Sequence, residues 1–177
     1  SAGFTHWAKL NNLKQAAKTM NFLTEHGISS YGELESKLNA VSARRDTAHA
    51  EIKRIESRSA ELALVMKHAG TYRQLKPLYD RYRKSNDKEK FLRGHESEII
   101  LFEAAARELK RLGAVPLPTT ESMKTELANL NAEKERLLAE YKAARAEAQE
   151  YETVKQNVDA LLTVPKEQEQ QRRYELE

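Results

Sequence analysis

The sequence predicts an all-α protein. Its largest part is expected to be a long antiparallel coiled-coil hairpin, with a small helical head at the tip and an N-terminal helix packed at the opposite end. The main observation is an apolar stripe with alternating spacings of four and three residues, as in a coiled-coil seam. This stripe runs through Met123, Leu127, Leu130, Lys134, Leu137, Tyr141, Ala144, Ala148, Tyr151, Lys155, Val158 and Leu162. The same spacing recurs earlier in the chain, at Leu34, Leu38, Val41, Arg45, Ala48, Ile52, Ile55, Ser59, Leu62 and Met66.

Two long helices separated by a middle segment can pair only if the chain folds back on itself. We therefore assign residues 30–70 and 119–163 to the two arms of the hairpin. If Met66 pairs with Met123, then Leu38 faces Tyr151, although a register shifted by one heptad is an alternative. Arg45, Lys134 and Lys155 lie within the stripes and are expected to set this register, the alternative being that they bind a ligand.

Short-range signals mark the ends of both arms. Ser30 and Glu33 match a capping box, and Gly70 is expected to end the first arm. Thr119 or Thr120 is expected to cap the second arm.

Residues 1–27 predict the N-terminal helix that packs on the base of the hairpin. Its apolar positions at helical spacing are Trp7, Leu10, Leu13, Ala17, Met20 and Leu23. Gly27 follows as the expected left-handed residue at the C-terminus.

Residues 71–118 lack the heptad pattern and are expected to form the helical head. Pro77 is expected in a first turn or at a kink, and Asn86 or Asp87 is expected to cap a helix from 88 to 112. Gly113 ends that helix, and a rigid connector leads to the second arm. Residues 164–177 are expected to form a polar, disordered tail.

Composition limits the class of protein. Charged residues make up 32% of the chain, aromatic residues 7%, and the mean hydropathy is −0.77, which favours narrow helix seams over a large globular core. No cysteine is present and no apolar run is long enough for a membrane span, so we expect a cytoplasmic protein with no membrane partner.

The chain begins without an initiator Met, and we interpret it as a fragment of a longer protein.

Charge is distributed unevenly along the chain. Residues 67–93 contain nine positive and three negative residues, a net charge of +6, whereas residues 121–162 carry −3. The basic residues alternate with Tyr72, Tyr79, Tyr82 and Phe91, as on surfaces that bind phosphates and exposed bases. The candidate DNA-binding residues are Arg73, Lys76, Arg81, Arg83, Lys84, Lys88 and Lys90. The alternative is that the tyrosines belong to the core and the cations form a solvated face.

The residues indicate no catalytic site, no metal site and no cofactor. The five histidines are scattered, and the position four residues after His95 is Ile99 instead of a second zinc ligand. The glycines stand singly, without a phosphate-binding loop. We therefore expect this chain not to be an enzyme by itself.

Several segments together carry a resemblance to a known family. They are WAKxxNLK (7–14), FLxEHGI (22–28), FxxxHESEIIL (91–101), LPT (117–119) and VKQNVDALL (154–162). With this layout the chain resembles the C-terminal helical region of relaxases, the mobilisation nucleases of conjugative and mobilisable elements of Gram-positive gut bacteria. In that family the DNA-nicking domain, with its tyrosine nucleophile and its metal-binding histidines, lies N-terminal to this region. No matching His-x-His cluster occurs here, so the resemblance assigns no catalytic residue.

The resemblance implies a cytoplasmic protein of a mobile element that works on transfer-origin DNA. Two hypotheses follow from it and from the charge pattern. In the first, the chain is a non-catalytic module that binds or positions this DNA through the basic head. In the second, it is a protein-interaction or oligomerisation arm that recruits conjugation-machinery proteins or a second copy of itself.

Overall fold

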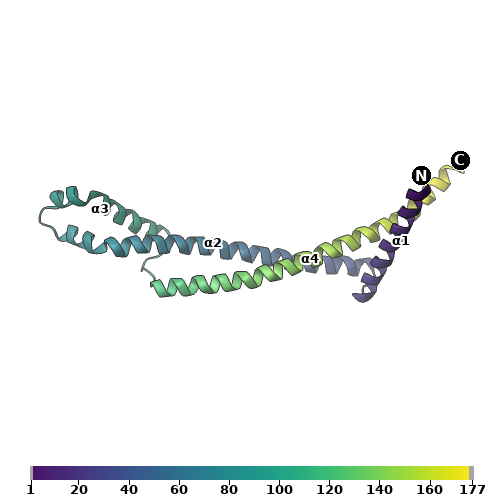
Figure 1. Cartoon of the computed structure of the whole chain (residues 1–177), viewed down its shortest axis with the longest axis horizontal. Coiled ribbons are helices and arrows are strands. Elements are labelled where there is room, and N and C mark those ends of the chain that lie inside the picture. The colour runs from purple at the N-terminus through teal and green to yellow at the C-terminus, as the bar shows by residue number, and fades with distance from the viewer. Residues whose placement is uncertain (1, 176–177) are drawn as a thin grey trace. The chain divides into compact units, whose positions relative to one another are not determined.

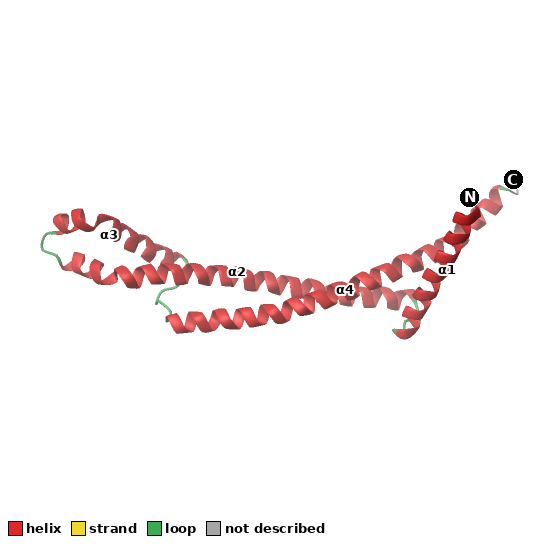
Figure 2. Ribbon diagram, in the orientation of Figure 1, coloured by secondary structure: helices red, strands yellow, loops and turns green. Residues whose placement is uncertain are grey.

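The computed structural model describes residues 2–175, and it describes Ala2 and residues 164–169 by their backbone alone. Helices and loops make up this part of the chain, and Figure 2 shows no strand in it. The predicted all-α class is therefore confirmed. The helices follow one another as α1 (Ala2–Glu25), α2 (Tyr31–Lys84), α3 (Lys88–Arg111) and α4 (Thr120–Tyr174) (Figure 1).

The connection between α1 and α2 uses the end signals that the sequence predicts. Gly27 adopts a φ of 63°, and the next amide, that of Ile28, donates to the carbonyl of Leu23 at 2.8 Å. This is the left-handed glycine cap typical of helix C-termini. At the start of α2, the amide of Glu33 donates to the hydroxyl of Ser30 at 3.2 Å. The Glu33 carboxylate accepts from the amide of Ser29, one residue before the partner that a standard capping box uses.

The ends of α3 and the start of α4 also follow local sequence signals. The side chain of Asp87 accepts from the amide of Lys90 at 3.1 Å and caps α3. Gly113 adopts a φ of 69° just after α3. The hydroxyl of Thr119 accepts from the amide of Ser122 at 3.1 Å, so Thr119 caps α4.

The chain forms two compact units. The first comprises Ser1–His49 with Leu138–Glu177, and the second comprises Ala50–Leu137. The core of the first unit consists of Phe22, Ile28, Leu34, Val41, Ala148, Tyr151 and Val154. In it, the ring of Phe22 meets the ring of Tyr151 edge to face at 5.0 Å, which joins α1 to α4. Asn157 donates a hydrogen bond to the hydroxyl of Thr19 at 3.3 Å and strengthens the same contact.

The second unit contains the C-terminal part of α2, all of α3 and the first part of α4. Its buried residues include Ile55, Leu62, Phe102 and Met123, each 5% exposed or less. Figure 1 shows α3 lying alongside the C-terminal part of α2. Each of the three helices thus contributes buried apolar side chains to this unit.

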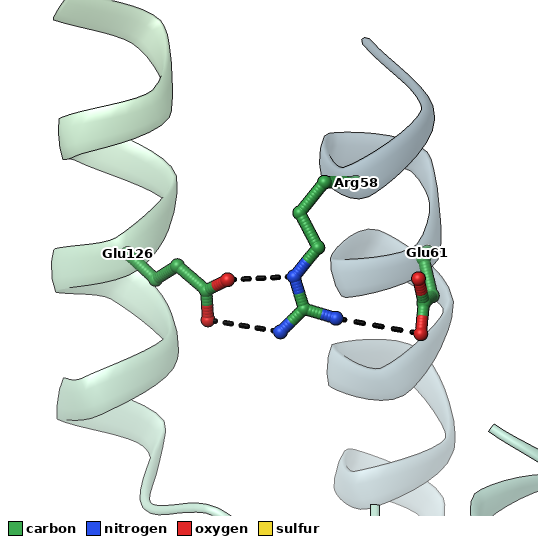
Figure 3. Close-up of polar contacts among 3 residues, drawn as sticks. All are labelled: Arg58, Glu61 and Glu126. Atoms are coloured by element: carbon green, nitrogen blue, oxygen red, sulfur yellow. Dashed lines mark hydrogen bonds and ion pairs between the residues drawn. The ribbon is translucent and has the colours of Figure 1, made fainter. Parts of the chain in front are cut away.

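A bidentate ion pair joins α2 to α4 within the second unit. Nε and Nη2 of Arg58 lie 2.6 and 3.2 Å from the two carboxylate oxygens of Glu126 (Figure 3). Nη1 of the same guanidinium lies 3.3 Å from Glu61, one turn along α2. Because the fork geometry matches a carboxylate, this pair fixes the relative position of the two helices more specifically than a single contact would.

The predicted stripes are the buried sides of α2 and α4. All ten stripe positions on α2 are buried or half-buried, as are eleven of the twelve on α4. The exception is Leu162, which is 58% exposed. The polar members Arg45, Lys134 and Lys155 are half-buried, and Lys134 lies 3.3 Å from the carboxylate of Glu56 on α2.

The prediction that Gly70 ends the first arm is wrong. Helix α2 continues through Gly70 and Pro77 to Lys84, so it includes part of the segment assigned to the head. Glycine lowers helix propensity by only about 1 kcal/mol relative to alanine. Next to it, Ala69 is fully buried and Tyr72 stacks on Phe102 of α3, and these contacts hold the helix together.

Two further expectations differ from the structure. The apolar face predicted for the N-terminal helix is largely exposed, with Trp7, Leu13 and Met20 each at least 59% exposed. Leu23 is the member of this face that packs against the core of the first unit, and the helix otherwise packs through Thr19 and Phe22. Helix α4 continues to Tyr174, beyond the end expected at residue 163. Residues 176 and 177 of the predicted tail lie outside the described residues.

Candidate nucleic-acid interface

Five of the seven predicted DNA-binding residues lie at the turn between α2 and α3, in the second unit. Arg81, Arg83 and Lys84 occupy the last turn of α2, while Lys88 and Lys90 occupy the first turn of α3. We call these five residues the basic turn. The two acidic residues within the same stretch are Asp87 and Glu89.

The side chains of the basic turn are available to a ligand. All five residues are exposed. Within residues 2–175, no described carboxylate lies at ion-pair distance from any of them. Asp87, one of the two acidic residues next to Lys88 in sequence, already accepts the amide hydrogen of Lys90 as the cap of α3. The turn therefore presents five cations that are not neutralised by a direct partner.

Helix electrostatics account for only part of this cluster. Cations in the last turn of a helix are stabilised by the negative end of its dipole, which favours Arg81, Arg83 and Lys84 at the end of α2. The first turn of a helix favours negative charge, so Lys88 and Lys90 occupy positions where their charge is unfavourable. Their positions are not explained by the stability of α3.

Arg73 and Lys76, the other two predicted residues, have partners within the protein. Arg73 donates hydrogen bonds to the hydroxyl of Thr120 at 3.0 Å and to the carbonyl of Pro118. Arg73, on α2, therefore holds the connector that precedes α4 in place against α2. Lys76 lies 3.1 Å from the carboxylate of Asp80, and the hydrogen bond to Asp80, together with its charge, raises the pKa of Lys76 above its ordinary value of 10.5. Both side chains have structural roles that the sequence pattern did not reveal.

The aromatic rings of this region pack on one another between α2 and α3. Phe102 stacks with Tyr79 at 4.2 Å between ring centroids and with Tyr72 at 4.8 Å. The ring centroids of Tyr82 and Phe91 are 6.0 Å apart. These contacts favour the interpretation that the tyrosines belong to the core of the head. The surface consequently offers cations for phosphates, while its rings are engaged with one another.

A shallow groove of about 430 Å³ lies beside these rings. It is lined by Tyr72, Lys76, Tyr79, Asp80, Phe102, Glu103, Ala106 and Arg107. The exposed Arg107 comes from α3 and was not among the predicted residues. Only the packing of α3 against α2 brings Arg107 into the same groove as Lys76, so no spacing in the sequence could have identified Arg107. The groove carries both signs of charge, unlike the basic turn.

His95 lies near the basic turn, on α3. Its backbone departs from helical geometry, with φ of −139° and ψ of 25°, and its ring contacts Phe91 at 4.8 Å. Nδ1 of His95 lies 3.7 Å from the carboxylate of Glu98. Across the described residues, no three His, Asp or Glu side chains gather closely enough to bind a metal ion. None of the described helices combines the length and apolarity that a membrane crossing requires.

Comparison with known proteins assigns no family to this chain. Comparisons of the chain with protein-family models, with curated proteins and with solved structures found no match.

Proposed function

We propose that this chain is the non-catalytic accessory region of a conjugative relaxase, and that it helps to bind or position transfer-origin DNA during mobilisation. The observation that supports this proposal most directly is the basic turn, with five exposed cations that lack ion-pair partners among the described residues. DNA phosphates are the ligands that such a cluster fits, because each neutralised phosphate releases a condensed counterion. The relaxase context comes from the sequence resemblance, and with it the cytoplasmic location.

The coiled-coil hairpin predicted from the sequence is part of this proposal. Its support is that α2 and α4 are joined by ion pairs in each unit, Arg44 with Glu147 at 2.7 Å and Glu56 with Lys134 at 3.3 Å. These partners lie close to the register in which Met66 faces Met123. In such a hairpin the two arms carry the head that presents the basic turn.

A salt series tests DNA binding at the basic turn. Fluorescence anisotropy is measured for single-stranded, duplex and hairpin DNA with the unmodified chain and with a triple variant, Arg81→Gln, Arg83→Gln and Lys84→Gln. We expect weaker binding by the variant. For duplex DNA, the slope of log K against log salt concentration should fall in magnitude by about 3, roughly 0.9 for each lost phosphate contact.

A matched control separates local contacts from the effect of net charge. Lys124, Lys142 and Arg145 are exposed residues of α4, and replacing all three by Gln changes the net charge by the same amount. This control should retain the affinity and the salt slope of the unmodified chain. Equal losses in both variants would show a nonspecific charge effect. Absence of binding at low salt, where electrostatic contacts are strongest, would refute the proposed function.

A protein-interaction arm that recruits transfer-machinery proteins is the second candidate function. The observation that favours it is the set of large apolar side chains left exposed on α1, including Phe4 at 70% and Trp7 at 62%. A chain that fails to bind DNA but retains a protein partner through α1 would support this function instead.

A further inference from the structure

The aromatic rings around the basic turn lie against other rings. The ring centroid of Tyr82 is 6.0 Å from that of Phe91 and 5.8 Å from that of Tyr79. Tyr79 in turn stacks on Phe102 at 4.2 Å. Proteins that bind single-stranded nucleic acid commonly use exposed rings on which successive bases stack. Within residues 71–100, all of which the structure describes, every Phe and Tyr side chain is half-buried, so none is a fully exposed platform for a base.

The hollow beside the basic turn is also poorly suited to a nucleotide. It measures about 290 Å³ and is lined by Ser85, Asp87, Lys90, Phe91, Gly94 and His95. The carboxylate of Asp87, which caps α3, places a negative charge in this lining and opposes the approach of a phosphate. The rings of Phe91 and His95 contact each other, with centroids 4.8 Å apart. We therefore assign recognition of DNA to the cations and not to this hollow.

The cations of the basic turn lie on more than one side of the two helix ends. In α2, Arg81 and Lys84 are three residues apart and share a face, whereas Arg83 lies about 160° around the helix axis from Arg81. In α3, Lys88 and Lys90 are separated by the same two-residue step. A DNA duplex carries a row of phosphates on each side of a groove, so cations on different sides can be neutralised together.

Contacts to phosphate alone favour the duplex over a single strand. Each neutralised phosphate contributes about 0.9 to the magnitude of the salt slope for B-DNA, against about 0.7 for a single strand. We infer, on the basis of the DNA binding proposed above, that the basic turn is a site for duplex DNA, which it holds through phosphates and not through stacked bases.

A comparison of two forms of DNA tests this preference. Fluorescence anisotropy is measured over a salt series for the 177-residue chain with a short duplex of mixed sequence and with a thymidine single strand of the same length. With five phosphate contacts, the two salt slopes should differ by about 1. If the two forms bind equally at about 1 M salt, where charges are screened, the duplex should bind about tenfold more tightly at about 0.1 M.

Substitutions in the basic turn should reduce this preference. The triple variant Arg81→Gln, Arg83→Gln and Lys84→Gln leaves two of the five contacts, so the preference for the duplex should fall from about tenfold to about 2.5-fold. The α4 control variant described above has the same net charge and should retain the preference of the unmodified chain. A tenfold preference that persists in the triple variant would overturn the assignment to the basic turn.

An abasic strand tests whether the bases take part. A single strand that keeps its sugars and phosphates but lacks bases should bind as tightly as the thymidine strand, because the cations contact phosphates alone. A loss of about tenfold or more on removal of the bases would show that stacking contributes, and would overturn the inference.

The outcomes distinguish this inference from the proposed function. A single strand that binds as tightly as the duplex, or more tightly, at about 0.1 M salt would overturn the preference for duplex DNA and leave DNA binding itself in place. Absence of binding to both forms at low salt would refute the inference together with the proposed function.

Discussion

Tyr31, the first residue of α2, forms a hydrogen bond to α4 that makes the hydroxyl of Tyr31 harder to ionise. Its hydroxyl donates to Asp159 at 2.7 Å, and Nζ of Lys155 lies 5.9 Å from the centre of its ring. The bond to Asp159 is the main cause that raises the pKa of Tyr31 to about 12, from an ordinary value of 10.0. Partial burial and the negative charges of Asp159 and Glu35 act in the same direction.

The raised pKa of Tyr31 predicts that the stability of the folded chain depends on pH in the alkaline range. Because the folded-state pKa is raised, the stabilisation from Tyr31 is fully present below pH 10 and is lost as the pH rises towards 12. Subtracting the ultraviolet titration of Tyr31→Phe from that of the unmodified chain isolates this phenol among seven tyrosines. The difference should show a midpoint near 12 in the unmodified chain. In Asp159→Ala the corresponding midpoint should return towards 10, and an unchanged midpoint there would contradict the assigned cause.

Helix ends illustrate what could be predicted from the sequence at the scale of elements. The side chains of Ser30, Asp87 and Thr119 each accept a hydrogen bond from the backbone amide three residues later, as their positions before helical patterns indicate. Gly27 and Gly113 adopt the positive φ expected after a helix. These predictions succeed because a cap depends on a few neighbouring residues.

Predictions that depend on partners far away in the sequence were less successful. Trp7, Leu13 and Met20 were expected to pack because they are apolar, but they are exposed. Of the predicted face, Leu23 packs against the core, and α1 otherwise packs through a side that includes the polar Thr19. At the candidate site, the excess of positive charge was evident from the sequence. The internal bonds of Arg73 and the stacking of Tyr72 and Tyr79 on Phe102 depend on the position of α3, which no local pattern encodes.

The continuation of α2 through Gly70 gives a prediction at the same scale. Gly70 lies inside the helix, and a Cβ added there has no atom within 4 Å. Gly70→Ala should therefore raise the free energy of unfolding by about 0.5–1 kcal/mol, since alanine has the higher helix propensity and restricts the unfolded chain. Chemical denaturation followed by circular dichroism measures this change.

Gly113 is the matched control for Gly70. It also has open space around it, but its φ of 69° is unfavourable for any residue with a Cβ. Gly113→Ala should therefore destabilise the protein, by about 1 kcal/mol. Destabilisation by Gly70→Ala of similar size would indicate that Gly70 ends a helix after all.

At the scale of the whole molecule, the two compact units differ in how the chain builds them. The second unit is one continuous segment, Ala50–Leu137, whereas the first combines Ser1–His49 with Leu138–Glu177. Formal charge differs as well, because the residues of the second unit sum to +4 and those of the first to −1. The basic turn thus belongs to a unit that is both continuous and positively charged.

A segment consisting of residues 50–137 should therefore fold by itself. Its core draws buried side chains from three helices, among them Ile55, Leu62, Phe102 and Met123, and Arg58 joins α2 to α4 inside the same segment. We expect a cooperative thermal transition of its helical circular dichroism signal and slow amide exchange around these core residues. Residues 1–49 alone should not show such a transition, because Tyr151 and Val154 of their core come from α4. If 50–137 folds and binds DNA with the salt slope of the full chain, the basic turn accounts for binding. If it folds but does not bind while the full chain does, residues outside this unit contribute to the DNA contact.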